Sequence, residues 1–248
     1  GRLLDLIEHK ALSISQITNL VIDEADKMFQ LGFEEEMNKL FAMMPSKKQT
    51  VFFSATLNDK VEEIKKRLTI NPVLVEIKAE EVNLDKITQL AYHVTEERKG
   101  PFLRYLIKEK NIKQALVFTS STRSADNLAE KLKKNKIPAT AVHGKKSQGS
   151  RSGNLHDFKE GGTQILVATD LIGRGIHIDS LEYVINYELP RSPLDYVHRI
   201  GRTGRALESG TAITILTDDE LQHFRVIQKK MGKRVELIRT EDINLHGF

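Results

Sequence analysis

Short, continuously apolar runs alternate with amphipathic helical patterns along almost the whole chain. Runs that are apolar at successive positions are typical of parallel strands covered on both faces, because a strand with one solvated face alternates apolar and polar residues. The expected strands are NLVIDE, TVFFSAT, PVLVEI, ALVFTSS, ATAVHG, QILVATD, YVINYEL and TAITILTD. This order predicts an α/β fold with mostly parallel, doubly wound sheets.

Amphipathic segments occupy the intervals between these runs. Between residues 59 and 70, Val61, Ile64 and Leu68 recur at helical spacing among lysines and glutamates. A second stripe of this kind consists of Ala125, Leu128, Ala129 and Leu132. An apolar stripe of this width predicts a helix that packs one face against a sheet.

A polar, charged stretch at residues 78–90 divides the chain into a short first α/β segment and a fuller second one. A chain of 248 residues suits one large or two ordinary domains, since about 150 residues per domain is usual. We therefore expect a first segment at 1–78, a linker at 79–87 and a second domain at 88–240.

Composition narrows the class of protein. The net charge of +4 and the isoelectric point near 9.1 are compatible with a polyanionic partner, although many basic proteins bind none. The chain has no cysteine, which excludes disulfides and thiolate metal sites and fits a cytoplasmic location. Its apolar runs are all shorter than the roughly 18 residues that a membrane span needs, so we expect no membrane association.

The apolar run from Leu20 to Ile22 ends in three acids, Asp23, Glu24 and Asp26. Ligands of open α/β sheets bind at the carboxyl ends of strands, where Mg²⁺ is held by a few carboxylates, waters and substrate phosphates. A second acid beside the metal can orient and deprotonate an attacking water. The pattern alone leaves a solvated turn or a helix N-cap open as alternatives.

Three arginines, Arg199, Arg202 and Arg205, are spaced by three residues, so a helical turn would line them along one side. Guanidinium groups match phosphate oxygens bidentately and stay charged at any working pH. The row therefore predicts phosphate recognition; a nucleic-acid backbone contact or a solvated face are the alternatives.

The sequences DEAD at 23–26, SAT at 54–56 and HRIGRTGR at 198–205 together resemble the DEAD-box RNA helicase family of superfamily 2. The resemblance continues through HGKKSQGSR, FKEGGTQILVATD and GRGIHI, in the family's order, and covers essentially the whole chain. It implies two RecA-like domains, the first incomplete, and an ATP hydrolase that unwinds RNA duplexes or remodels ribonucleoproteins. The implied cofactors are ATP and Mg²⁺, and the implied partner is RNA; no protein partner can be identified.

The resemblance also implies roles for individual residues. Glu24 would activate the hydrolytic water, Arg202 and Arg205 would be arginine fingers, and Asp23 would hold Mg²⁺ through water. Ser54 and Thr56 would couple the nucleotide state to unwinding. The residues on the nucleotide side are Asp23, Asp26, Ser54, Thr56, Gly175, His177 and His198. Those on the RNA side are Arg2, Ser120, Arg123, Gln148, Arg151, Thr169 and Asp170, with Gly175 in the same strand-end loop as the last two. Individually, each of the RNA-side residues could simply belong to a turn, and His198 could be a packing histidine.

Two departures from the family pattern affect the expected activity. His177 stands where the family has an aspartate that contacts the ribose, and an imidazole cannot supply two acceptor oxygens, so we expect weakened or retuned ATP binding. The phosphate-binding pattern G-x-x-x-x-G-K-[ST] does not occur in the sequence. We expect that loop upstream of Gly1 in a parent protein. An RNA-binding module without ATPase activity is the main alternative, and a P-loop motor acting on DNA is another.

Overall fold

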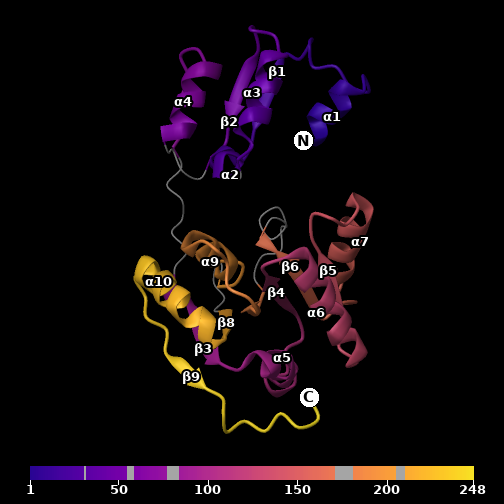
Figure 1. The fold of residues 1–248 in the computed structure, drawn as a ribbon, viewed down its shortest axis with the longest axis vertical. Coiled ribbons are helices and arrows are strands. Elements are labelled where there is room, and N and C mark those ends of the chain that lie inside the picture. Colours follow the sequence, from indigo (N-terminus) through magenta and orange to yellow (C-terminus); the bar gives the residue numbers. More distant parts are fainter. Residues whose placement is uncertain (31, 55–58, 77–83, 171–180, 205–209) are drawn as a thin grey trace. The chain divides into compact units, whose positions relative to one another are not determined.

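The computed structural model describes residues 1–248 except 31, 55–58, 77–83, 171–180 and 205–209. The described residues form two compact units, unit 1 (Gly1–Lys78) and unit 2 (Ala79–Phe248) (Figure 1). Both consist of parallel strands joined by helices, which confirms the predicted α/β class. In the part of the chain that the structure describes, every helix is too short or too polar to cross a lipid bilayer.

Unit 1 pairs two short parallel strands and packs helices on them. Residue Ile22 of the first strand lies opposite Phe52 of the second, and the core contains Ile22, Met37, Val61 and Ile64. The predicted stripe Val61–Ile64–Leu68 therefore packs as expected. The elements are α1 (Arg2–Glu8), β1 (Asn19–Ile22), α2 (Ala25–Gln30), α3 (Glu34–Ala42), β2 (Gln49–Phe52) and α4 (Asp59–Leu68).

One strand prediction in unit 1 was wrong. The segment PVLVEI is not a strand over its described residues, and Val73, Leu74 and Val75 are 88%, 61% and 78% exposed. The described part of unit 1 offers this segment no neighbouring strand, and an unpaired apolar run gains neither ladder hydrogen bonds nor burial. Val21 and Phe53 are also more than half exposed, as expected for a sheet of so few strands.

Unit 2 is built on a wider parallel sheet. Its described strands lie in the order β5-β6-β4-β7-β8-β3-β9, and all neighbours run parallel. The strands are β3 (Ile87–His93), β4 (Ala115–Thr119), β5 (Ala139–Val142), β6 (Ile165–Thr169), β7 (Tyr183–Asn186), β8 (Gly210–Leu216) and β9 (Leu237–Arg239). The helices are α5 (Glu96–Glu109), α6 (Thr122–Lys134), α7 (Gln148–Lys159), α9 (Pro193–Ile200) and α10 (Leu221–Met231), with 3₁₀ turns at Leu84–Lys86 and Asp218–Glu220.

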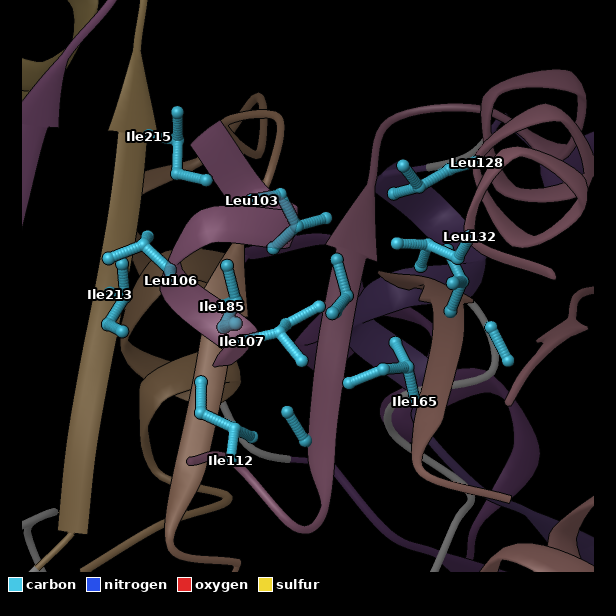
Figure 2. Close-up of a cluster of buried hydrophobic side chains, with 14 of the residues drawn as sticks. Leu103, Leu106, Ile107, Ile112, Leu128, Leu132, Ile165, Ile185, Ile213 and Ile215 are labelled. Carbon is cyan, nitrogen blue, oxygen red and sulfur yellow. The ribbon is translucent and has the colours of Figure 1, made fainter. Parts of the chain in front are cut away.

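Helices cover both faces of this sheet, as a doubly wound fold requires. Alternate strand residues point to opposite faces, so Val117 and Leu116 of β4 belong to different apolar clusters. The cluster that contains Val117 packs the sheet against α5 and α6 (Figure 2). The other face carries α7 through Phe158, and α9 and α10 through Tyr196 and Phe224.

Two strands of unit 2 were not predicted. Strand β3 begins at Ile87, inside the polar stretch interpreted as a linker, because its polar residues Thr88 and Gln89 hide the apolar pattern. Strand β9 has only three residues and lies at the edge of the sheet. Beyond β9 the chain runs past α5 (Figure 1), where Arg98 donates hydrogen bonds to the carbonyls of Thr240 (2.8 Å) and Ile243 (2.7 Å).

Candidate functional site

The acidic cluster of unit 1 lies at the carboxyl end of β1, at the same edge as the end of β2. The Phe53 amide donates to the Ile22 carbonyl (2.8 Å), and the Ala25 amide donates to the Phe53 carbonyl (3.1 Å). These bonds tie the end of β1 to the end of β2, so Asp23 and Ser54 follow neighbouring strands. The acidic cluster and the segment that begins at Ser54 therefore lie at the same edge of the sheet.

The three acids differ in exposure. Asp23 and Glu24 are exposed, whereas Asp26, in the first turn of α2, is only 1% exposed. The first two can therefore meet a hydrated cation and a water, while Asp26 is held inside unit 1. Thr56 lies outside the described residues, and Ser54 is half-buried.

The backbone at Glu24 has a left-handed conformation, with φ of +49°. For a residue with a Cβ this conformation costs of order 1–3 kcal/mol, and it persists where the surroundings fix it. The Glu24 amide donates to Asp23 Oδ1 (2.8 Å), and its carbonyl accepts from the Met28 amide at the start of α2. The turn thus holds the Asp23 and Glu24 side chains at the strand end instead of letting the helix start there.

In unit 2 the polar groups also gather at the carboxyl ends of neighbouring strands. The strands β5, β6, β4 and β7 are consecutive in the sheet, and parallel strands end at one edge. The residues that follow them directly include His143 after β5, Asp170 after β6 and Ser120 after β4. Ser120 and Asp170, both expected to contact RNA, therefore follow adjacent strands.

Arg199 organises this edge from inside unit 2. Its guanidinium is 2% exposed and forms a bidentate ion pair with Asp170, at 2.5 and 2.9 Å. It also donates to Asn186 Oδ1 (3.1 Å) and to the carbonyl of Glu188 (2.7 Å), and lies 4.9 Å from the centre of the Phe118 ring. Three acceptor groups and one aromatic face thus surround this buried cation.

The expected row of three arginines along a helix was wrong. Helix α9 ends at Ile200 with Gly201 as its C-cap, so only Arg199 lies on the helix. Arg202 follows the helix end, where its amide donates to the Arg199 carbonyl (3.1 Å) and its own carbonyl accepts from Leu181 (3.4 Å). Arg205 lies outside the described residues. Arg199 and Arg202 therefore do not lie along one helix face.

Sequence reasoning missed Glu188, two residues beyond β7. Its carboxylate accepts from the Ser120 amide (2.6 Å), from Ser120 Oγ (2.5 Å) and from Ser124 Oγ (2.7 Å). Burial alone would raise the pKa of Glu188, but these hydrogen bonds and the charge of Lys99 outweigh it and lower the pKa below its ordinary value. Glu188 thus fixes the loop that carries Ser120. The sequence signal that could have identified Glu188 is its position near the end of the predicted strand YVINYEL.

Helix α7 carries two more of the expected RNA contacts in its first turns. Ser147 caps the helix and accepts from the Ser150 amide (3.2 Å). Gln148 is exposed, and its side-chain oxygen accepts a hydrogen bond from the guanidinium of Arg151. The structure therefore brings this pair together on one helix face.

The remaining expected residues are less closely grouped. Arg2 begins α1 and is paired with Asp5, and Arg123 is exposed in the first turn of α6. Thr169 ends β6 and is buried, whereas His198 lies half-buried on α9. Gly175 and His177 lie outside the described residues. Among the residues that can be described, no three acidic or histidine side chains form a metal-binding group by themselves.

Comparison with known proteins identifies both parts of the chain. The model of the family described as "DEAD/DEAH box helicase" matches residues 1–64, and that described as "Helicase conserved C-terminal domain" matches residues 98–207. Named relatives include the DEAD-box ATP-dependent RNA helicase CshA of Geobacillus kaustophilus and of Bacillus subtilis, 37% and 36% identical over 249 residues. The chain is covered fully in both cases and spans about half the length of these relatives, 53% and 50%.

Solved structures agree with this relationship. Dbp5 of S. cerevisiae bound to RNA and ADP BeF3 is similar with a TM-score of 0.78 and 32% identity, over 97% of this chain and 64% of that one. The C-terminal domain of the DEAD-box protein Dbp5 matches 64% of this chain with 32% identity and a TM-score of 0.60, and 94% of that domain is covered. The two units are therefore parts of a RecA-like helicase core, and the chain belongs to the DEAD-box helicase family.

Proposed function

We propose that the chain is the core fragment of an RNA helicase whose parent protein couples ATP binding and hydrolysis to local RNA unwinding or ribonucleoprotein remodelling. The observation that carries this proposal is the placement of exposed acids at the strand ends of unit 1, together with Ser120 and the Asp170–Arg199 ion pair at those of unit 2. The names of the CshA relatives, and the RNA and ADP BeF3 bound to Dbp5, support the same reaction. The cysteine-free composition fits action in the cytoplasm.

We assign residues 1–78 to the C-terminal part of the first RecA-like domain, 79–87 to a linker and 88–240 to the second RecA-like domain. Family models that match residues 1–64 and 98–207 support this assignment.

The exposed carboxylate of Asp23 fits a hard cation such as Mg²⁺, which needs few protein ligands because waters and phosphates complete its shell. When bound, Mg²⁺ would offset the charge of the transferred phosphate. Glu24 accepts the proton of the attacking water, and the fixed turn at this residue holds its carboxylate at the strand end. Asp26, which is buried in the first turn of α2, would link these acids to the other motifs.

The other assignments follow the family motifs. On the nucleotide side, Arg202 and Arg205 stabilise the charge that develops on the transferred phosphate, and His198, Gly175 and His177 complete this part of the site. Ser54 and Thr56 couple nucleotide state to RNA. The RNA backbone is contacted by Arg2, Ser120, Arg123, Gln148, Arg151, Thr169 and Asp170, without reading of sequence. Asp170, directly after β6, would contact the RNA backbone while its carboxylate stays paired with Arg199.

A second candidate function is RNA binding without ATPase activity by this chain alone. The observation that favours it is the sequence itself, in which no G-x-x-x-x-G-K-[ST] pattern occurs to hold the phosphates. RNA-stimulated phosphate release separates the two. We expect none from residues 1–248 and a measurable rate from a version extended upstream through a phosphate-binding loop. If the extended version is equally inert, and His177→Asp does not restore activity, the helicase assignment fails.

For RNA binding, we expect Arg151→Ala to weaken affinity alike for RNAs of different sequence. Loss of one phosphate contact should reduce the slope of log K against log salt by about one. The measurement is fluorescence anisotropy with labelled single-stranded RNAs at several salt concentrations. An unchanged salt slope would count against a phosphate contact by Arg151, and a sequence-dependent loss would indicate base reading instead.

A further inference from the structure

Two consecutive lysines, Lys145 and Lys146, lie in the loop between β5 and α7, directly before the helix that carries Gln148 and Arg151. The loop is short, and the Lys146 amide donates to the carbonyl of His143 (3.0 Å). By sequence alone the two lysines are indistinguishable: both are solvated cations beside an expected RNA contact.

Asp126, on the second turn of α6, makes the two lysines different. Its Oδ1 lies 2.9 Å from Lys146 Nζ, and its Oδ2 lies 3.0 Å from His143 Nε2, without a favourable hydrogen-bond direction in the second case. His143 is 2% exposed, so this carboxylate is anchored against the core of unit 2. Its contacts therefore connect α6 to the loop after β5.

Asp126 carries its charge at neutral pH. Its partial burial would raise the pKa of the carboxyl, but the contacts from Lys146 and His143 outweigh burial, and the pKa lies below its ordinary value. A charged Asp126 offsets the ammonium of Lys146 and restrains that side chain. The Lys146–Asp126 pair therefore has almost no net charge and attracts a phosphate less than an unpaired lysine does.

Lys145 has the opposite environment. Its side chain is exposed, and among the described residues no carboxylate lies within ion-pair distance of its Nζ. Its charge remains available to a polyanion, next to the Gln148–Arg151 pair in the chain. An uncompensated cation at this place adds to the attraction of an RNA backbone, because each phosphate that it neutralises releases a counterion.

We propose that Asp126 is a positioning residue that holds Lys146 as a structural cation and leaves Lys145 as a further RNA-phosphate contact beside Gln148 and Arg151. The inference rests on the proposed function, because it requires RNA at the start of α7. The alternative is that both lysines are solvated and contribute equally to the field that attracts RNA.

The test compares Lys145→Gln, Lys146→Gln and Asp126→Asn in the full chain of 248 residues. Binding of a labelled single-stranded RNA is followed by anisotropy over a series of potassium chloride concentrations, and thermal unfolding is measured on the same samples. We expect Lys145→Gln to reduce the salt slope by about one without changing the melting temperature. Lys146→Gln should lower the melting temperature and leave the salt slope unchanged. Lys146→Arg, which keeps a cation beside Asp126, should have the melting temperature of the unmodified chain.

Asp126→Asn releases Lys146, so it should lower the melting temperature without reducing the salt slope. The proposal is overturned if Lys145→Gln leaves the slope unchanged, or if Lys146→Gln reduces it as much as Lys145→Gln does. Arg151→Ala, measured in parallel, distinguishes failure of the role proposed for Lys145 from failure of RNA binding at α7. An effect of Arg151→Ala with none of Lys145→Gln rejects only the role of Lys145, whereas no effect of either rejects RNA binding at α7 as well.

Discussion

Replacing Arg202 with alanine, in the protein extended upstream through a phosphate-binding loop, should lower kcat for RNA-stimulated ATP hydrolysis by roughly 10³–10⁵-fold. The transferred phosphate gains charge on its outer oxygens in the transition state, and a guanidinium placed against them stabilises that state more than the bound substrate. Arg202 suits this role because the turn after α9 fixes its backbone. Phosphate release at saturating ATP and RNA measures the effect.

The matched control is Arg191→Ala, which removes an exposed arginine from the connection before α9. It should leave kcat within a factor of about two, since exposed substitutions usually act within ±0.5 kcal/mol. Arg202→Lys should recover only part of the rate, because an ammonium keeps the charge without the planar fork. Equal rates for the Arg202 and Arg191 alanine variants would contradict the assignment of Arg202 as a finger.

Arg199→Ala should lower the free energy of unfolding of unit 2 by about 3–5 kcal/mol, a large part of the total stability of a typical domain. The change leaves Asp170 without its cationic partner and removes the donors to Asn186 and to the Glu188 carbonyl. Urea unfolding followed by tyrosine fluorescence measures it selectively, because all five tyrosines of the chain lie in unit 2.

Two further variants separate the ion pair from the rest of the Arg199 environment. Asp170→Asn keeps the contacts of the guanidinium to Asn186 and Glu188, so it should cost less than Arg199→Ala. Arg191→Ala again supplies an exposed arginine as control, with an expected change within about 0.5 kcal/mol. If Arg199→Ala were as mild as Arg191→Ala, the buried cation would not be a structural centre of unit 2.

The apolar pattern of short stretches predicted most of the strands and helices correctly. The continuously apolar runs predicted the parallel strands β1, β2 and β4 to β8, and the stripes of 61–68 and 125–132 predicted helices α4 and α6. The segment PVLVEI and strand β3 were assigned wrongly for one shared reason. Whether a segment becomes a strand depends on a neighbour with which it can pair, and β3 finds β8 and β9 far along the chain.

The sequence by itself determined the fold class, the order of the family motifs and which side chains follow strand ends, because these are properties of short stretches. Only the tertiary structure decided the roles of similar neighbours. Asp26 is buried while Asp23 is exposed, and Arg199 is an interior ion-pair partner while Arg202 follows the helix end. Lys146 pairs with Asp126, whereas Lys145 has no ion pair with any residue that the structure describes. The physical reason is that desolvation and ion pairing depend on partners from distant segments, such as Asp170 for Arg199 and Asp126 for Lys146, whose approach no local pattern records.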